Sequence, residues 1–208
     1  MKNIIIILIA IVLGLSCQTY FPNTFSKNAK NLPKITFKTS NSDNVIYVNK
    51  DMEINSSDVG RIIITKPNIT ITFKAPFTEK SLTNIQKIKS ITDNTASATL
   101  IFKGGDYYIE DLKVSDNKKD KINKNGFKIK TPNYSRLFVK NFEIKNNKPI
   151  PINISLNEEN TPNAFLIYAI NSFKIDTKGK IKGNFYLYWY SDITLKANPS
   201  SLIKNNSC

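Results

Sequence analysis

The chain has 208 residues and a formal net charge of +14, because 30 Lys and Arg oppose 16 Asp and Glu. It contains no His, which excludes a His-based catalytic triad, a His-ligated zinc site and an imidazole general base. The glycine-rich phosphate-binding motifs and the acidic calcium-binding loop are also absent from the sequence. We therefore expect no cofactor and no metal site.

The N-terminus has the pattern of an export signal. Lys2 is followed by an unbroken apolar run over residues 4–15, which ends at Ser16. A helix that crosses a bilayer needs about 20 apolar residues, so this run is too short for a stable anchor and fits the apolar region of a signal peptide. Residues 1–16 are therefore predicted to be a signal peptide.

Cys17 stands where bacterial lipoproteins are cleaved and acylated. Gly14, Leu15, Ser16 and Cys17 resemble a lipobox, although Gly14 stands where Leu is expected. The chain is also rich in Lys, Asn and Ile and has only two Arg. With this composition and the relaxed lipobox, it resembles Borrelia-type spirochaete surface lipoproteins, and one candidate among them is the persistence-in-ticks kind. The resemblance implies a lipoprotein signal peptide, palmitate on Cys17, attachment to the cell outer membrane and a virulence-associated part in colonisation or persistence. The alternatives left open are a secretory signal with an unmodified Cys17 and a disulfide from Cys17 to Cys208.

The mature chain divides into a short polar stretch and a longer β-rich part. Residues 17–32 are polar and turn-rich and predict a tether, although Phe25 and its aromatic neighbours are able to dock on the domain. Residues 33–208 contain about twelve β-branched and aromatic runs bounded by Asn, Asp, Pro, Ser and Gly. Such runs are typical of an all-β domain.

One stretch, residues 77–91, predicts a short helix. Mostly helical intervals separate its apolar residues Phe77, Leu82, Ile85, Ile88 and Ile91. Further along, residues 115–125 carry four Lys and predict a charged, solvated loop.

Two all-β folds fit the remaining runs. Phe127 and Ile129 alternate with Lys128 and Lys130, which puts one side of the strand in a core and the other in water, as in an antiparallel β-sandwich. Strand-turn-strand units also fit the rungs of a right-handed parallel β-helix, but stacked rungs are expected to recur at a steady interval of about 20 residues, and these runs do not. An antiparallel β-sandwich with one short helix is therefore predicted, with the parallel β-helix as the alternative.

The densest acidic cluster does not form a catalytic pair on its own strand. Asp106 and Glu110 are expected on one face about 13 Å apart, with Asp111 on the other face. Inverting glycosidases hold their two carboxyl groups roughly 6.5–9.5 Å apart, so a second strand would have to supply a partner. No catalytic residue is predicted, and solvated acids after a glycine turn are expected.

The run 185–190 is the candidate binding surface. Its residues alternate between two faces, Phe185, Leu187 and Trp189 on one and Tyr186, Tyr188 and Tyr190 on the other. A row of Tyr offers large apolar area with polar tips to a protein or a carbohydrate, but burial in a central strand covered by a second sheet is the favoured interpretation. The high Lys content is interpreted mainly as compositional bias, although a basic surface also suits an anionic glycan.

These patterns favour a non-catalytic, lipid-anchored protein that acts by contact at the cell surface. The expected partners are the membrane, through lipid on Cys17, and a host or vector surface protein or an anionic glycan; no nucleic acid is expected because the chain is exported. Two alternatives stay open, a carboxylate-dependent enzyme acting on polysaccharide and a structural or assembly lipoprotein on the periplasmic face.

Overall fold

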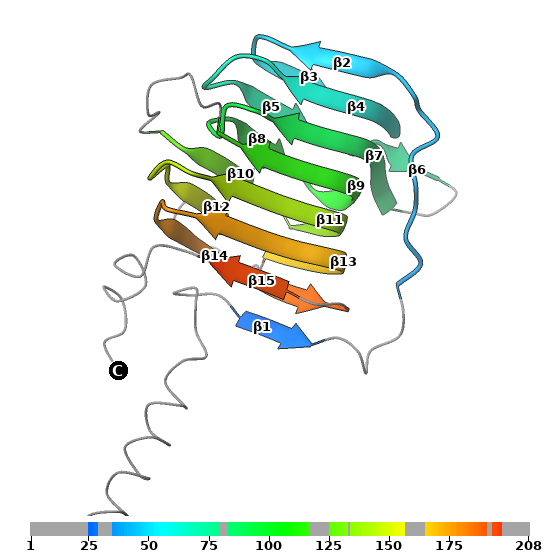
Figure 1. Cartoon of the computed structure of the whole chain (residues 1–208). Helices are drawn as coiled ribbons and strands as arrows, with labels where there is room; N and C mark the ends of the chain where they lie inside the picture. Colours follow the sequence, from blue (N-terminus) through cyan, green and yellow to red (C-terminus); the bar gives the residue numbers. More distant parts are fainter. Residues whose placement is uncertain are drawn as a thin grey trace, which may run out of the picture.

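The computed structural model describes residues 25–28, 35–79, 83–116, 125–132, 134–156, 165–190 and 193–196. Within these ranges every regular element is a β-strand (Figure 1). In chain order the strands are β1 (Phe25–Asn28), β2 (Val45–Val48), β3 (Met52–Ile54), β4 (Asp58–Ile64), β5 (Thr70–Phe73), β6 (Phe77–Thr78), β7 (Thr83–Asp93), β8 (Thr99–Phe102), β9 (Gly105–Ser115), β10 (Phe127–Thr131), β11 (Ser135–Asn146), β12 (Ile152–Leu156), β13 (Phe165–Thr177), β14 (Ile181–Trp189) and β15 (Ile193–Lys196). The all-β prediction is confirmed.

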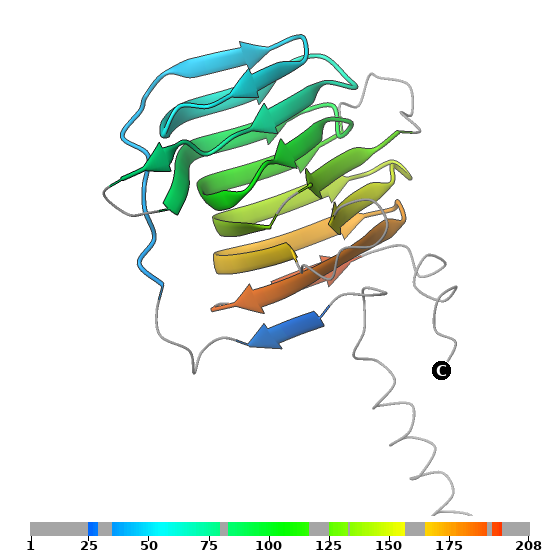
Figure 2. The same cartoon turned by 180° about the vertical axis from the view of Figure 1, so that it is seen from behind.

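The strands wind into a parallel β-helix (Figures 1 and 2). Sheet A runs in the order β2-β4-β7-β9-β11-β13-β14, and sheet B runs β3-β5-β8-β10-β12-β14. The chain passes alternately from one sheet to the other, so each coil of the helix adds one parallel strand to each sheet. The strand β14 joins both sheets, because its first part pairs with β12 and its second part with β13. Among the described strands, the two-residue β6 is antiparallel to its partner β7.

The predicted antiparallel β-sandwich is wrong, and the parallel β-helix alternative matches the observed pairing. Uneven spacing, which argued against a β-helix, comes from turns of different length and from a register shift between β11 and β13. Hydrogen bonds join neighbouring coils across 17 residues (Thr65 and Val48), 21 (Ser115 and Asn94), 30 (Asn141 and Asp111) and 31 (Ser172 and Asn141). A β-helix constrains the strands, whereas its turns lie at the surface and tolerate insertions.

The predicted helix over residues 77–91 is also wrong, because this segment forms β6 and the first part of β7. Ile85 faces outward and is covered by a neighbouring segment, whereas Ile88 and Ile91 point into the core. Between the two core residues, Lys89 and Ser90 both lie partly exposed, which interrupts the alternation of the strand. The helix-like spacing of the three Ile residues therefore arises from a bend and from burial on two faces.

Columns of apolar side chains fill the space between the sheets. The register aligns Ile62, Ile91, Leu112, Phe142 and Phe173 on successive strands of sheet A, and all five are buried. The rings of Phe142 and Phe173 stack with their centroids 4.4 Å apart. Burying a Phe side chain stabilises a fold by roughly 1.5–3 kcal/mol, so such columns hold successive coils together.

The N-terminal part of the described chain contacts both ends of the β-helix. The strand β1, which lies within the segment expected to be a tether, pairs in parallel with β14 of the last coil. Residues 35–44, called the strap below, then lead along the outer face of sheet A to β2 in the first coil (Figure 1). The strap thereby covers part of a sheet face that would otherwise be exposed.

Candidate binding surface on sheet A

Four aromatic side chains form a column on the outer face of sheet A. Tyr108, Phe138, Tyr168 and Tyr188 lie in register on β9, β11, β13 and β14. The successive ring centroids are 4.6, 4.8 and 5.2 Å apart, and the ring planes are within 16° of parallel. Adjacent parallel strands lie about 4.8 Å apart, so identical register positions bring the rings into stacking distance.

The strap covers one half of this aromatic column. The Phe37 ring meets Tyr108 edge-on at 5.7 Å, and the Lys38 ammonium group lies 5.4 Å from the centroid of the same ring. Tyr108 and Phe138 are therefore only 6% and 4% exposed, whereas Tyr168 is partly exposed. The column is closed at its β9 end and open toward β13 and β14.

An ion pair lies beside the column. The Arg136 guanidinium donates from Nε and Nη2 to the two Asp106 carboxylate oxygens, at 2.6 and 2.5 Å, and lies 5.5 Å from the Phe138 ring centroid. The hydrogen bond with Asp106 raises the pKa of Arg136 against the opposing effect of burial. Burial raises the pKa of Tyr108, and the Asp106 charge adds to the shift. The pair thus holds a permanent cation next to the stacked rings.

The open end of the column is a group of four tyrosines, Tyr134, Tyr168, Tyr188 and Tyr190, called the open tyrosine cluster below. Tyr134 is 50% exposed, and the other three are partly exposed. Burial raises the pKa of Tyr168; the Arg136 charge opposes this, and the phenols of Tyr188, Tyr134 and Tyr190 add to it. Burial likewise raises the pKa of Tyr190. The phenols of Tyr168 and Tyr190 therefore stay neutral at physiological pH and can donate hydrogen bonds.

Two of the three residues in the predicted tyrosine row, Tyr188 and Tyr190, belong to the open tyrosine cluster. Tyr188 belongs to the column, and Tyr190 follows β14 with its N–H donating to Ala169 O at 3.0 Å. Tyr186 lies in β14 opposite Leu166, and its side chain is outside the description. The predicted core position of Leu187 is confirmed, since this residue is 1% exposed.

Sequence reasoning missed Tyr134 and Tyr168, which come from other coils. The prediction followed tyrosines along one strand, whereas the structure assembles them across strands. Aromatic residues recur at positions 108, 138, 168 and 188, and this recurrence was a signal that a stacked column was present.

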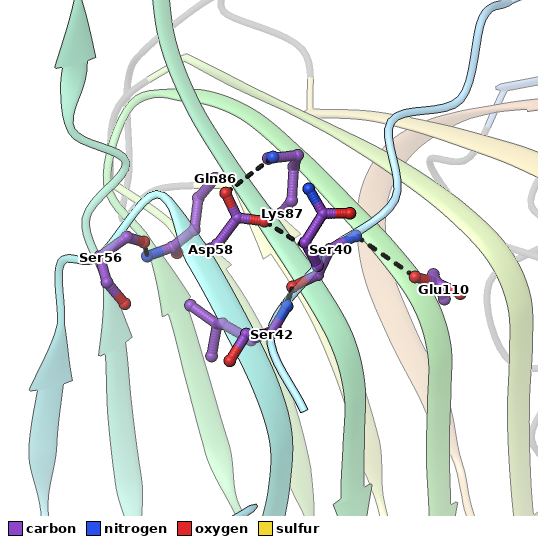
Figure 3. A network of polar contacts seen from close by, with 9 residues as sticks. Ser40, Ser42, Ser56, Asp58, Gln86, Lys87 and Glu110 are labelled. Atoms are coloured by element: carbon purple, nitrogen blue, oxygen red, sulfur yellow. Dashed lines mark hydrogen bonds and ion pairs between the residues drawn. The ribbon is translucent and has the colours of Figure 1, made fainter. Parts of the chain in front are cut away.

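Polar contacts fasten the strap to sheet A (Figure 3). The buried Ser40 hydroxyl donates to Val59 O at 2.8 Å and accepts the Ser42 N–H at 3.2 Å. The Ser40 N–H donates to Glu110 Oε1 at 3.3 Å, and the Asn41 N–H donates to an Asp58 carboxylate oxygen at 3.0 Å. The strap backbone is therefore hydrogen-bonded to side chains from β4 and β9.

Lysines on β7 reinforce these contacts. Lys87 pairs with Asp58 at 2.7 Å, and Lys89 pairs with Asp43 of the strap. Burial opposes ionisation of Asp58, but hydrogen bonds from Lys87 and from the Asn41 N–H lower its pKa below the ordinary value. The hydrogen bond with Lys89 lowers the pKa of Asp43. Both carboxylates are ionised at neutral pH.

Each of the three carboxylates of the acidic cluster forms an ion pair or a hydrogen bond within the fold. Asp106 is paired with Arg136, Glu110 accepts from the strap, and Asp111 accepts from Asn141 Nδ2 at 2.8 Å. The expectation that Asp111 faces away from the other two acids is wrong, because it is exposed on the outer surface. Alternation fails here, since Glu110 and Asp111 both lie outside the core between buried Ile109 and Leu112.

Some predictions from the sequence concern residues outside the described ranges. Cys17, Cys208 and most of the predicted loop 115–125 are not among the described residues. Over the described ranges no helix is long and apolar enough to span a membrane, and no three potential metal ligands gather. Comparison with known proteins found no matching family model, no matching curated protein and no matching solved structure.

Proposed function

We propose that this β-helix is an outer-surface lipoprotein, anchored through Cys17, that acts by binding a host or vector surface protein and not by catalysis. The observation that carries the proposal is the open tyrosine cluster beside Arg136. Tyr and Arg are enriched at the energetic centres of protein interfaces, because they combine large contact area with hydrogen-bonding groups. Tyr also loses little conformational entropy on binding, especially where stacking already restricts it.

The stacking geometry favours a protein partner over a sugar ring at this surface. Tyr168 stacks between Phe138 and Tyr188, at 4.8 and 5.2 Å, so both of its ring faces are occupied. Tyr168 therefore presents its ring edge and its hydroxyl group, and not a ring face, to a partner. Such a surface suits the mixed apolar and polar contacts of a protein interface, whereas stacking of a sugar needs a free ring face.

The enzyme alternative has less support from the geometry. Asp106 and Glu110, the candidate carboxylates, each have a structural partner in Arg136 and in the Ser40 N–H. A general acid or base has to reach a substrate proton at hydrogen-bond distance, and these partners compete for the same oxygen atoms. Binding is therefore the function that the described surface supports best.

The interface is tested with a double variant and a matched control. Tyr134→Ser with Tyr190→Ser removes two rings at the rim of the cluster and leaves the stacked column intact. Tyr47→Ser removes an equally large ring, 68% exposed, from the first coil. We expect the double variant to bind mammalian and tick cells at least about tenfold more weakly than the parent, and Tyr47→Ser to bind as the parent does.

Equal losses in both variants, or a parent chain that binds neither cell type, would contradict the proposed interface. Anchoring is tested separately by labelling with a palmitate analogue. The parent should carry label and Cys17→Ala should lose both label and membrane retention; an unlabelled parent contradicts the anchor. Protease digestion of the protein on intact cells is expected for surface display, whereas protection would indicate the periplasmic face.

A further inference from the structure

We infer that the outer face of sheet B is a second binding surface, which takes a linear acidic polysaccharide. Alternation along its strands puts apolar residues inside and, apart from Ile101, polar residues outside. Thr70, Thr72, Thr99, Lys128 and Lys130 are partly exposed, whereas their neighbours in the same strands are buried. Asn153 on β12 continues the outer face.

These outward residues form a regular grid. One column contains Thr70, Thr99, Lys128, Asn153 and the position of Lys182; the next contains Thr72, Ile101, Lys130 and the positions of Ser155 and Asn184. The register between these strands runs without a shift, unlike that of sheet A, which shifts between Val139 and Asn141. Polar groups therefore repeat at about 4.8 Å across the strands and about 6.6 Å along them. A repeating array of outward groups, interrupted at Ile101, matches a linear polymer with repeating units better than a compact ligand.

The charge on this face is one-sided. No Asp or Glu occurs in β5, β8, β10, β12 or the part of β14 that pairs in sheet B. Lys128 and Lys130 lie on the face, and the register adds the position of Lys182. Compositional bias explains the many Lys residues, but it does not explain why these four strands and the adjoining part of β14 carry no acid.

Sheet A shows the contrast. Its strands carry outward acids, namely Asp58, Asp106, Glu110, Asp111 and Glu143, alongside the basic residues. At the border of sheet B, Glu53 on β3 pairs with Lys103 at 3.8 Å, and Asp51 accepts the Thr70 N–H at 2.8 Å. The strands beyond this border face solvent with an unbalanced positive charge, which raises the local concentration of a polyanion.

The residue types on this face favour a polysaccharide over a nucleic acid. Thr hydroxyl and Asn amide groups can donate to and accept from sugar hydroxyls, while Lys pairs with sulfate or carboxylate groups. Sites for single-stranded nucleic acid combine cationic residues with aromatic platforms on which bases stack. The described outward positions of β5, β8, β10 and β12 contain neither an aromatic residue nor an Arg.

The test uses the full chain in a neutral detergent, with heparin as the acidic polysaccharide. Lys128→Gln with Lys130→Gln removes two charges from sheet B; the control, Lys113→Gln with Lys174→Gln, removes two exposed charges flanking Glu143 on sheet A. We expect the sheet B variant to bind heparin about tenfold more weakly, and its dependence of log affinity on log salt to lose a slope of about two. The control variant should bind as the parent does, and circular dichroism with thermal unfolding checks that both variants fold.

Three results would overturn the inference: equal weakening in both variants, a parent chain that does not bind heparin, or single-stranded DNA of equal charge bound at least as tightly as heparin. The variant with Tyr134→Ser and Tyr190→Ser should retain heparin binding, because its substitutions lie beside the strands β11 and β14 of sheet A, away from Lys128 and Lys130 on β10. Failure of the polysaccharide surface and failure of the tyrosine interface can therefore be told apart.

Discussion

The substitution Ser40→Ala tests whether the strap contributes to the stability of the fold. Ser40 is 6% exposed, its hydroxyl donates to Val59 O at 2.8 Å, and it accepts the Ser42 N–H at 3.2 Å. In Ser40→Ala both contacts are lost, and the Val59 carbonyl loses a donor in a place that water reaches poorly. The variant should therefore loosen the strap along sheet A.

The expected cost follows from these two hydrogen bonds. A hydrogen bond contributes about 1 kcal/mol net, and a buried group left without its partner costs about 1–3 kcal/mol. Ser42 is partly exposed and can regain water, so the larger penalty applies to Val59. We expect a loss of about 2 kcal/mol in the free energy of unfolding. For a chain of this size, that loss lowers Tm by about 4–8 °C.

Urea unfolding of Ser40→Ala and of Thr39→Ala measures this effect. Thr39 is the exposed neighbour of Ser40, so its substitution should cost no more than about 0.5 kcal/mol. Amide hydrogen exchange gives a local readout, because the Arg61 N–H donates to Asn44 O of the strap at 2.7 Å. Faster exchange at Arg61 is expected in Ser40→Ala. Equal stability of the two variants, with unchanged exchange at Arg61, would refute the reasoning.

Two further predictions concern the interior. Phe142→Ala removes a ring whose centroid lies 4.4 Å from that of Phe173, and it should lower the free energy of unfolding by about 3–5 kcal/mol in a thermal unfolding experiment. Phe77 is 60% exposed, so Phe77→Ala should change the free energy of unfolding little. Similar losses in the two variants would contradict the stacked core. Burial raises the pKa of Tyr107 from 10.0 to about 12, so its contribution to stability is full below pH 10 and is lost as pH rises toward 12. Tyr107→Phe should therefore show a weaker alkaline loss of stability than the parent, and identical pH profiles would contradict this.

The sequence predicts which face of an individual strand is buried and which face is exposed. Phe127 and Ile129 are fully buried while Lys128 and Lys130 are partly exposed, as the period of two requires. Alternation is a local property of an extended chain, so it needs no knowledge of the partner strand. For the same reason, the all-β class followed from the β-branched and aromatic runs.

The pattern of apolar residues along the chain gave wrong predictions where a strand bends or where a second layer covers its outer face. Ile85, Ile88 and Ile91 suggested a helix, although Ile85 packs under the strap and the other two lie in the core. Asp111 likewise lies outside because alternation breaks beside Glu110. A break in alternation depends on how neighbouring coils pair, which the residues of one strand do not reveal.

The sequence by itself determined the strand composition and the side of most strands that is buried, because these depend on residues close together in the chain. Only the tertiary structure decided that the strands are parallel, that Tyr108, Phe138, Tyr168 and Tyr188 stack, and that the acids gather on sheet A. These features depend on contacts between coils separated by turns of unequal length. The net charge of +14 is a property of the sequence, whereas the alignment of the carboxylate-free strands β5, β8, β10 and β12 in one sheet is a property of the fold.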